Sequence, residues 1–593
     1  MIPYLTVRRR TSRPPFARSF PMLRPRLVLI LSLALPIVSQ QQYPFDSDHQ
    51  EGYEFKWPIK KVAIIGAGVS GLIAYREFNR GDFETVRVFE RDSVPGGNWH
   101  YTEETPLDAP IPNVDPAIGD FQPSLPPVGR SLPTEEYYLG DEANQRWRDH
   151  RGPKPLWESL KSNAPSPVQQ ITELPWPQGT PWQLPHRLLA RYLRAFASFH
   201  GINNNDGNPD ISYNTRVELV ERRHDEAGNE HGWRLTLKQL ERITSQKVKA
   251  TWWTEDFDAV VVATGRYNAP SLPRIKGLKE WATKFPGSVS HSRQYRRPES
   301  FHNETIVVIG AGVSDVLFLS GDFDLSLVQT SAVEIAREVN EHARHVYQSI
   351  REANPKLPYA FTRIQLSRLP PNISRIPEIK AFHVNNASIE LVNGTYLYDV
   401  TRVVFGTGFH YSFPFLPQFH ESGAVNKNPI VTDGTHLRAL YEDFLYIEEP
   451  TIGFLSMNWG MQSFTYAEYL SLALAKVWSK KAVLPSTKEL WRIYNNRIRE
   501  REGYGRHLQF LGAERTTTRI RFFVAWLNQA AVRFGGRQIE GEPKANEEIM
   551  TVWSRALYGV DRFTSSGNTT TGASFVEAAL ATGSGDWVYG EDW

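Results

Sequence analysis

Short apolar runs that end in glycine-containing turns recur along the chain. Residues 62–65, 261–263, 306–309 and 403–405 consist of Val, Ile, Ala and Phe, and each run leads into a glycine within two residues. Continuous apolar runs of this length are typical of strands buried on both faces of a parallel sheet. The pattern therefore predicts an α/β protein with parallel sheets.

Residues 217–257 have a different pattern. Two alternating stretches flank the turn-forming letters DEAGNEHG, and KATWWTEDFD follows them. This predicts antiparallel strands inserted before the parallel strand that starts near residue 260. Helical patterns lie around residues 467–477 and 520–531, whereas residues 564–584, rich in Ser, Thr and Gly, are typical of a flexible tail.

The composition excludes several classes of function. The 593 residues are 40% hydrophobic and 12% aromatic, which is enough for two or more buried cores. The absence of cysteine excludes disulfides, thiolate nucleophiles, iron–sulfur clusters and Cys-ligated zinc, so a redox enzyme of this sequence needs a cofactor. The 67 Lys and Arg nearly balance the 65 Asp and Glu, so we expect no nucleic-acid partner. We also expect no metal site, since no HExxH motif is present.

The N-terminal segment has the character of a targeting signal. Seven arginines and no acidic residue precede Asp46, and an apolar run covers residues 27–38. The run is shorter than the ~20 residues that span a bilayer. We therefore predict a secretory signal at 1–39 and no spanning helix, with an organelle presequence as the alternative. Five Asn-X-Ser/Thr sequons agree with a lumenal or secreted glycoprotein, at Asn303, Asn372, Asn386, Asn393 and Asn568.

A first nucleotide-binding motif follows the apolar run at 62–65. The letters GAGVSG give a GxGxxG pattern in which one glycine permits a tight turn, one a close approach to pyrophosphate and one the packing of a helix on the strand. Glu90 ends the next strand, where a carboxylate can accept both ribose hydroxyls, which suits FAD or NAD. The predicted cofactor-binding residues here are Gly66, Gly68, Ser70, Gly71, Glu90, Gly97, Asn98 and Trp99.

A second set of motifs resembles a known family. Phe285, Gly287, His291 and Tyr295 spell FxGxxxHxxxY. Together with the first GxGxxG, the VVATG and FGTGF stretches and a second glycine motif at Gly310, this order resembles the flavin-containing monooxygenases over roughly residues 60–486. The final Tyr in place of Trp is more similar to the N- and S-oxygenating, dimethylaniline monooxygenase-like branch than to the Baeyer–Villiger branch.

The resemblance implies roles for several further residues. Asn163 would orient the oxygen adduct of the flavin, because an amide donates and accepts a hydrogen bond without taking a proton; a helix C-cap is the alternative. His291 is also among the predicted cofactor-binding residues, and we expect it to position a loop at the domain junction rather than to transfer protons. The remaining predicted cofactor-binding residues of this group are Ser162, Thr264, Gly265, Thr407 and Gly408, the last four in two turns that we expect to act as hinges.

The second glycine motif is interrupted. Gly310, Gly312 and Ser314 match the family pattern, but Asp315 stands where a small residue belongs, and the expected helix resumes only at residue 332. We hypothesise that residues 315–331 are an insertion or untranslated sequence retained in the gene model. If they are part of the protein, Asp315 adds negative charge at a phosphate site, which puts NADPH binding in doubt. In the next predicted strand, Ser349 and Arg351 are candidates for the nucleotide ribose and its 2′-phosphate.

The resemblance implies two Rossmann-like domains with the NADP domain inserted into a discontinuous FAD domain, plus C-terminal helices. The expected boundaries are 59–270 and 399–486 for FAD, 271–398 for NADP, 487–563 for helices and 564–593 for the tail.

The implied reaction uses FAD, NADPH and O2, through a C4a-hydroperoxyflavin, to oxygenate an amine nitrogen or a sulfide sulfur of a small molecule. Ketone oxidation and a flavoprotein without turnover are the alternatives. The sequence leaves the substrate, the oligomeric state and association with a membrane open.

Overall fold

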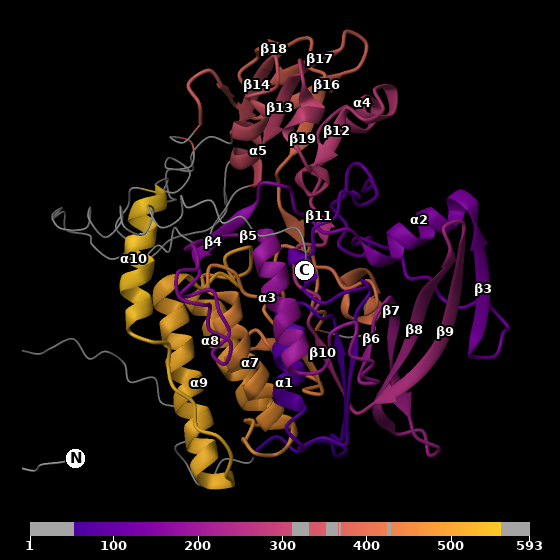
Figure 1. Ribbon diagram of the computed structural model, residues 1–593, viewed down its shortest axis with the longest axis vertical. Helices are drawn as coiled ribbons and strands as arrows, with labels where there is room; N and C mark the ends of the chain where they lie inside the picture. The colour runs from indigo at the N-terminus through magenta and orange to yellow at the C-terminus, as the bar shows by residue number, and fades with distance from the viewer. Residues whose placement is uncertain (1–51, 311–330, 351–365, 367–368, 424–427, 559–593) are drawn as a thin grey trace, which may run out of the picture. The chain divides into compact units, whose positions relative to one another are not determined.

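A parallel sheet built around the first apolar run forms the larger lobe of the computed structural model, which describes residues 52–310, 331–350, 366, 369–423 and 428–558 (Figure 1). The strand order is β21-β22-β23-β10-β1-β2-β6, and the five strands from β23 to β6 are parallel. The bounds are β1 Lys61–Ile65, β2 Thr85–Phe89, β6 Ile211–Ser212, β10 Ala259–Val262, β21 Leu440–Tyr441, β22 Leu445–Tyr446 and β23 Ile452–Phe454.

Helices α1 (Val69–Phe78) and α7 (Ser463–Trp478) pack on this sheet and on each other. Helix α7 lies so close to β23 that a Cβ on Gly453 would come within 2.8 Å of the Leu474 side chain. Both helices begin at the carboxyl ends of strands, where ligands of open α/β sheets bind.

A second parallel sheet forms the smaller lobe at the top of Figure 1. Its order is β12-β19-β13-β14-β15, and helix α5 (Ser331–Val339) packs on β13 and β14. The strands are β12 Val289–His291, β13 Thr305–Ile309, β14 His345–Ser349, β15 Ser374–Ile376 and β19 Arg402–Phe405. An antiparallel sheet and helix α4 (Leu278–Lys284) adjoin it, with strands β16 Ile379–His383, β17 Ser388–Leu391 and β18 Tyr396–Leu397.

The alternating region folds as the sequence predicts. Strands β7 (Thr215–His224), β8 (Glu230–Thr244) and β9 (Lys247–Phe257) form an antiparallel sheet, which β3 (Thr134–Leu139) completes next to helix α2 (Gly140–Arg151). The remaining elements are β4 Lys161–Pro165, β5 Gln183–Pro185, β11 Ala269–Pro270, β20 Phe409–His410, α3 His186–Phe199, α8 Thr487–Glu500, α9 Gly512–Phe534 and α10 Ala545–Tyr558.

The expected domain boundary at residue 399 is wrong. Strand β19 pairs with β12 and β13 of the second sheet, so the smaller lobe extends to residue 405. The chain passes between the lobes after each Thr-Gly turn, and the two crossings pair as the antiparallel strands β11 and β20. This pairing places the two turns predicted to be hinges side by side.

Several predictions concern residues outside the described ranges. Among them are the signal-like segment at 1–39, the tail at 564–593, the sequon at Asn568 and all of the predicted insertion except Ser331. The asparagines of the other four sequons are exposed, and the secretory location stays a prediction. None of the helices in the described ranges is long and apolar enough to span a membrane.

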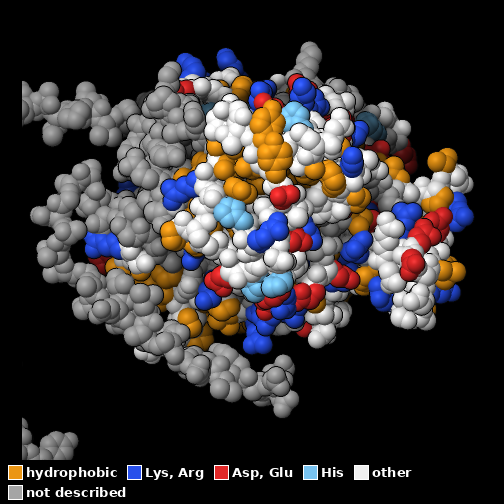
Figure 2. Space-filling view, turned by 90° about the horizontal axis from the view of Figure 1, so that it is seen from above, with side chains coloured by type: hydrophobic (Ala, Val, Ile, Leu, Met, Phe, Trp, Pro, Cys, Tyr) orange, Lys and Arg blue, Asp and Glu red, His pale blue; other side chains and the backbone are white. Residues whose placement is uncertain are grey.

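Charges of both signs mix on the surface. On the face shown in Figure 2, the described Lys and Arg side chains are interspersed with Asp and Glu side chains. This distribution agrees with the formal net charge of +2 and provides no broad basic field on that face for nucleic acid.

Candidate functional site

One cavity reaches both glycine motifs. Its volume is about 1190 Å³, and its lining includes Ile65, Ala263, Ile309 and Ser349, which end or follow strands of the two parallel sheets. A pocket for one drug-sized ligand measures about 300–1,000 Å³. The cavity is therefore large enough for parts of two dinucleotides and a small substrate.

The first glycine motif is shaped by steric contacts. A Cβ on Gly71 would lie 1.8 Å from the Gly66 carbonyl oxygen, and a Cβ on Gly97 would lie 2.8 Å from the Gly68 Cα. Gly66 has φ +103°, a conformation that glycine adopts at little cost. The two glycine-rich loops thus pack backbone to backbone, and Gly66, Gly68, Ser70, Gly97, Asn98 and Trp99 all line the cavity.

Glu90 is held by backbone amides. Its carboxylate accepts hydrogen bonds from the N–H groups of Ala67, at 2.7 Å, and Asp92, at 2.8 Å. Each carboxylate oxygen retains a lone pair, so the side chain can still accept from two ribose hydroxyls. The residue also lines the cavity, as the prediction for a ribose-binding carboxylate requires.

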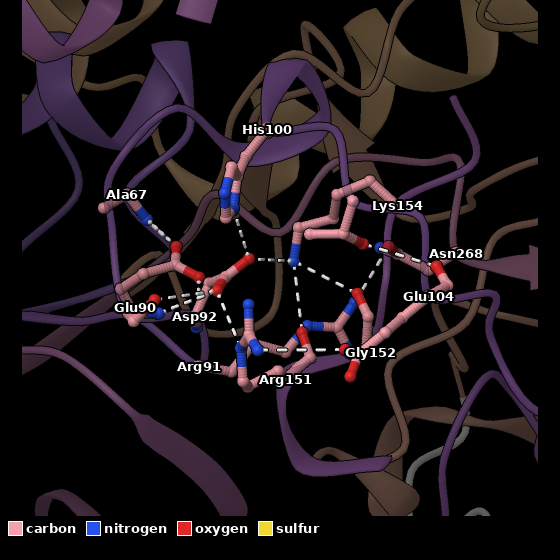
Figure 3. A network of polar contacts seen from close by, with 12 residues as sticks. Ala67, Glu90, Arg91, Asp92, His100, Glu104, Arg151, Gly152, Lys154 and Asn268 are labelled. Atoms are coloured by element: carbon pink, nitrogen blue, oxygen red, sulfur yellow. Dashed lines mark hydrogen bonds and ion pairs between the residues drawn. The ribbon is translucent and has the colours of Figure 1, made fainter. Parts of the chain in front are cut away.

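A buried charge network adjoins Glu90, and the sequence analysis missed it (Figure 3). Asp92 lies 2.9 Å from His100 Nδ1, 3.1 Å from Arg151 Nε and 3.5 Å from Lys154 Nζ. Burial acts to raise the pKa of Asp92, but these groups, Lys154 foremost, hold that pKa well below its usual range. The network ties the 90–100 loop to the 151–154 segment, and no local motif signals a contact between residues this far apart.

Asn163 lines the cavity from β4, so the alternative of a helix C-cap is wrong. Ser162 was predicted beside it, but it is absent from the described lining residues. The Ser162 hydroxyl donates to the Ala164 carbonyl at 2.8 Å and accepts from the Leu184 N–H at 2.9 Å. Successive side chains of a strand point to opposite sides, so Ser162 faces the protein interior when Asn163 faces the cavity.

The two Thr-Gly turns also reach the cavity, which Thr264, Gly265, Thr407 and Gly408 all line. The Thr264 Oγ1 atom is buried and has no hydrogen-bond partner among the described residues. A buried hydroxyl of this kind is normally satisfied, so it fits a bound ligand. Thr407 instead donates to the Ser271 carbonyl.

His291 holds the second turn in place without lining the cavity. Its Nδ1 accepts the Arg293 backbone N–H at 3.2 Å, so Nε2 carries the hydrogen and donates to the Gly408 carbonyl at 3.0 Å. Burial, aided by the charge of Arg293, lowers the pKa of His291 to about 3. The ring is therefore neutral at physiological pH and supports a loop, which agrees with the predicted positioning role, whereas the prediction that His291 binds a cofactor has no support, since it is not among the described lining residues.

This pKa predicts an acid-dependent loss of stability. The unfolded chain binds a proton near pH 6.5, whereas folded His291 binds one only near pH 3, so its contribution to stability falls as pH drops through that window. In His291→Gln, where the side-chain amide can still donate to Gly408, we expect a pH slope smaller by up to about 1.4 kcal/mol per pH unit. Urea unfolding at pH 7 and pH 5.5 measures the slope, and an unchanged slope would contradict the assigned burial.

Tyr295, the last fingerprint residue, binds Glu338, which in turn contacts the segment before Asn163. Its hydroxyl donates to Glu338 Oε2 at 2.7 Å, and Glu338 Oε1 accepts from Trp157 Nε1 at 3.2 Å. Glu338 lies on α5 of the smaller lobe, whereas Trp157 precedes β4. The contact joins the helix after the second glycine motif to the segment that carries Asn163.

The second glycine motif is described only in part. Gly310 has φ +113° and lines the cavity with Ser349, but Gly312, Ser314 and Arg351 lie outside the described residues. A Cβ on Gly310 would come within 2.6 Å of the Gly406 carbonyl oxygen and 3.7 Å of the Ala332 Cβ. Helix α5 therefore starts next to Gly310, and Ser331, which the sequence analysis did not select, lines the cavity at its first turn.

The N-terminus of α7 forms another wall of the cavity. Gln462 and Ser463 line the cavity, and the first N–H groups of a helix have no partner within the helix. This end carries a partial positive charge suited to an electron-rich ligand group. Trp459 also lines the cavity, whereas Phe464 and Tyr466 belong to the buried core.

Comparisons with known proteins agree on one family. Residues 145–354 match the model of flavin-binding monooxygenase-like proteins, and residues 64–114 match an NAD(P)-binding Rossmann-like domain. The chain is 48% identical over 554 residues to the flavin-containing monooxygenase iboF of Amanita muscaria, covering 87% of this chain and 99% of that protein. It is 28% identical over 508 residues to ustF2 of Aspergillus flavus, covering 79% and 92% respectively.

The fold agrees with solved structures as well. The S-allyl-L-cysteine S-oxygenase of Allium sativum superposes with a TM-score of 0.57 at 23% identity, covering 88% of this chain and 98% of that chain.

Proposed function

Because the chain belongs to the flavin-containing monooxygenase family, we propose that it oxygenates a soft nucleophile, an amine nitrogen or a sulfide sulfur, of a small molecule. The proposed reaction consumes NADPH, a proton and O2. One oxygen atom is added to a lone pair of the substrate, the other leaves as water, and NADP+ is released, so that atoms and electrons balance.

FAD and NADPH are the cofactors of this family, and the residues present fit both. The glycine loops, Glu90 and the unpartnered hydroxyl of Thr264 would hold FAD. Gly310, Ser331 and Ser349 would contact NADPH. When bound, FAD supplies the chemistry that takes a hydride from NADPH and activates O2.

The side chains of this chain then have to orient and shield the reacting groups. Asn163 provides an amide that can donate and accept at the oxygen being transferred without removing its proton. The first N–H groups of α7 would stabilise negative charge on the bound flavin. The Asp92 network and the Trp157–Glu338 hydrogen bond hold the segment that precedes Asn163.

The observation that carries the proposal is the convergence of three predicted features on one cavity. The first glycine motif, Gly310 of the second motif and Asn163, which come from different parts of the chain, line the same space. This is the arrangement that a hydride transfer followed by a shielded oxygen transfer requires.

Ketone oxygenation is the second candidate. It needs a cation that keeps the attacking oxygen group deprotonated, and Arg266 and Arg506 both line the cavity. Arg506 lies beside Gly408, where a Cβ would be 3.6 Å from Arg506 Nη1. The two candidates use the same cofactors and differ in their products.

Product analysis with isotope-labelled oxygen tests the proposal. The FAD-loaded full chain is incubated with NADPH, 18O2 and, in separate reactions, methyl p-tolyl sulfide, N,N-dimethylaniline and cyclohexanone. We expect a sulfoxide or N-oxide carrying one labelled atom, whereas labelled lactone alone would select the ketone reaction. NADPH oxidation that yields only hydrogen peroxide with all three compounds would contradict both candidates.

A further inference from the structure

The backbone at Asn163 is supported by a residue from the far end of the chain. Strand β4 pairs with β5 at Lys161 and Pro165, and the register is irregular between them. Within this irregular stretch, the Asn163 carbonyl oxygen accepts a hydrogen bond from the Trp553 indole Nε1 at 3.0 Å. A side chain of α10 therefore binds the backbone where the ladder of β4 is interrupted.

The face of α10 that carries Trp553 is buried. Trp553 and Met550 are 3% and 2% exposed, and they pack with Val168 and Trp182 in one hydrophobic cluster. The rings of Trp553 and Trp182 lie 6.2 Å apart. This packing fixes the direction of the Trp553 indole N–H, so the hydrogen bond to Asn163 has a defined geometry.

The same helix contacts a second wall of the cavity. The Gln462 side-chain amide lies 3.9 Å from the Met550 sulfur, and Gln462 precedes the first turn of α7 and lines the cavity. Helix α10 thus touches the strand of Asn163 and the start of α7. No local motif in residues 545–558 indicates this contact.

We propose that Trp553 is a positioning residue for Asn163, and that α10 is part of the active-site wall. The role of Asn163 rests on the function proposed above, whereas the position of its backbone does not. An amide that orients a reacting oxygen has to be held within about 0.5 Å, and an error of about 1 Å can cost about 100-fold in rate. Loss of the indole N–H should therefore increase the share of NADPH electrons released as hydrogen peroxide.

The test compares Trp553→Phe with Trp182→Phe in the full-length, FAD-loaded protein. Both changes replace an indole with a phenyl ring in the same cluster, but only the first removes the donor to Asn163. With methyl p-tolyl sulfide as the probe, we expect Trp553→Phe to raise the hydrogen peroxide share by about threefold or more. We expect flavin reduction by NADPH to stay within about twofold of the wild type. Trp182→Phe should leave the share unchanged.

Hydrogen exchange provides a readout that does not depend on turnover. In Trp553→Phe we expect amides of residues 160–166 to exchange about fivefold faster, while those of β1 and β10 keep their protection. Equal effects of the two substitutions, or unchanged exchange at 160–166, would overturn the proposal. A wild-type protein that fails to oxygenate any probe would refute the proposed function instead, and the exchange comparison would still decide the role of Trp553.

Discussion

Deleting residues 315–331 is expected to increase the rate of flavin reduction at low NADPH concentration by about tenfold or more, because it restores an anion-binding helix start. In the full chain, Asp315 stands at the third position of the second glycine motif. Each charge-assisted hydrogen bond to a phosphate contributes about 1.5–3 kcal/mol, so the loss of one accounts for a tenfold or larger change in affinity.

The geometry of the described residues favours this deletion. Gly310 and Ala332 flank the interruption, and a Cβ on Gly310 would lie 3.7 Å from the Ala332 Cβ. Gly310 and Ala332 are therefore already close, and residues 311–314 remain to connect them. Since Ser314 and Ser331 are identical, removal of 314–330 or 315–331 yields the same sequence, GAGVSAVEIAREV.

Stopped-flow absorbance at the flavin band measures the reduction rate against NADPH concentration. Asp315→Gly in the full chain is the matched control, because it removes the charge and the Cβ but keeps the added length. We expect it to recover only part of the effect. If the full chain reduces its flavin as fast as the deletion variant, the interruption does not impair NADPH binding. If neither protein is reduced while both retain FAD, the alternative without turnover gains support.

Short-range steric and electrostatic rules explain why much of the FAD site could be predicted. The conflict between a Cβ at Gly71 and the Gly66 carbonyl arises within six residues of chain, so the glycine pattern alone predicts the turn. The ribose-binding position of Glu90 could be predicted because it lies one strand–helix–strand unit after the start of the first strand. The order of the motifs similarly predicted two parallel sheets, which the structure confirms.

The wrong or missed predictions concern features that depend on contacts between segments far apart in the sequence. Ser162 faces inward, where the Leu184 N–H of β5 donates to its hydroxyl. Neither the pairing of β4 with β5 nor its irregular register can be deduced from the local sequence. Lys154 meets Asp92 across 62 positions of sequence, and Trp553 meets Asn163 across 390. The predicted boundary at 399 was wrong because an apolar strand could belong to either parallel sheet. Only the pairing of β19 with β12 and β13 assigns this strand to the smaller lobe.

The substitution Gly71→Ala should weaken FAD binding strongly. The added Cβ would lie 1.8 Å from the Gly66 carbonyl oxygen and 2.9 Å from its carbon, so the backbone of the turn has to move. Overpacking of this kind costs about 1–3 kcal/mol, and a shift of the turn also displaces the N–H groups that face the pyrophosphate. We expect the dissociation constant for FAD to rise by about 30-fold or more.

Quenching of flavin fluorescence on titration of the apoprotein measures this constant, and circular dichroism separates lost binding from lost folding. Gly541→Ala is the matched control, since a Cβ there would meet no atom within 4 Å. Gly68→Ala gives a sharper comparison, because its Cβ would make only an ordinary 3.6 Å contact with the Gly97 Cα. If Gly68→Ala weakens FAD binding without altering the fold, the added Cβ interferes with the close approach of the backbone to the pyrophosphate. If Gly71→Ala binds FAD as tightly as the wild type, the helix start is not the phosphate site, and the assignment of the larger lobe to FAD is wrong.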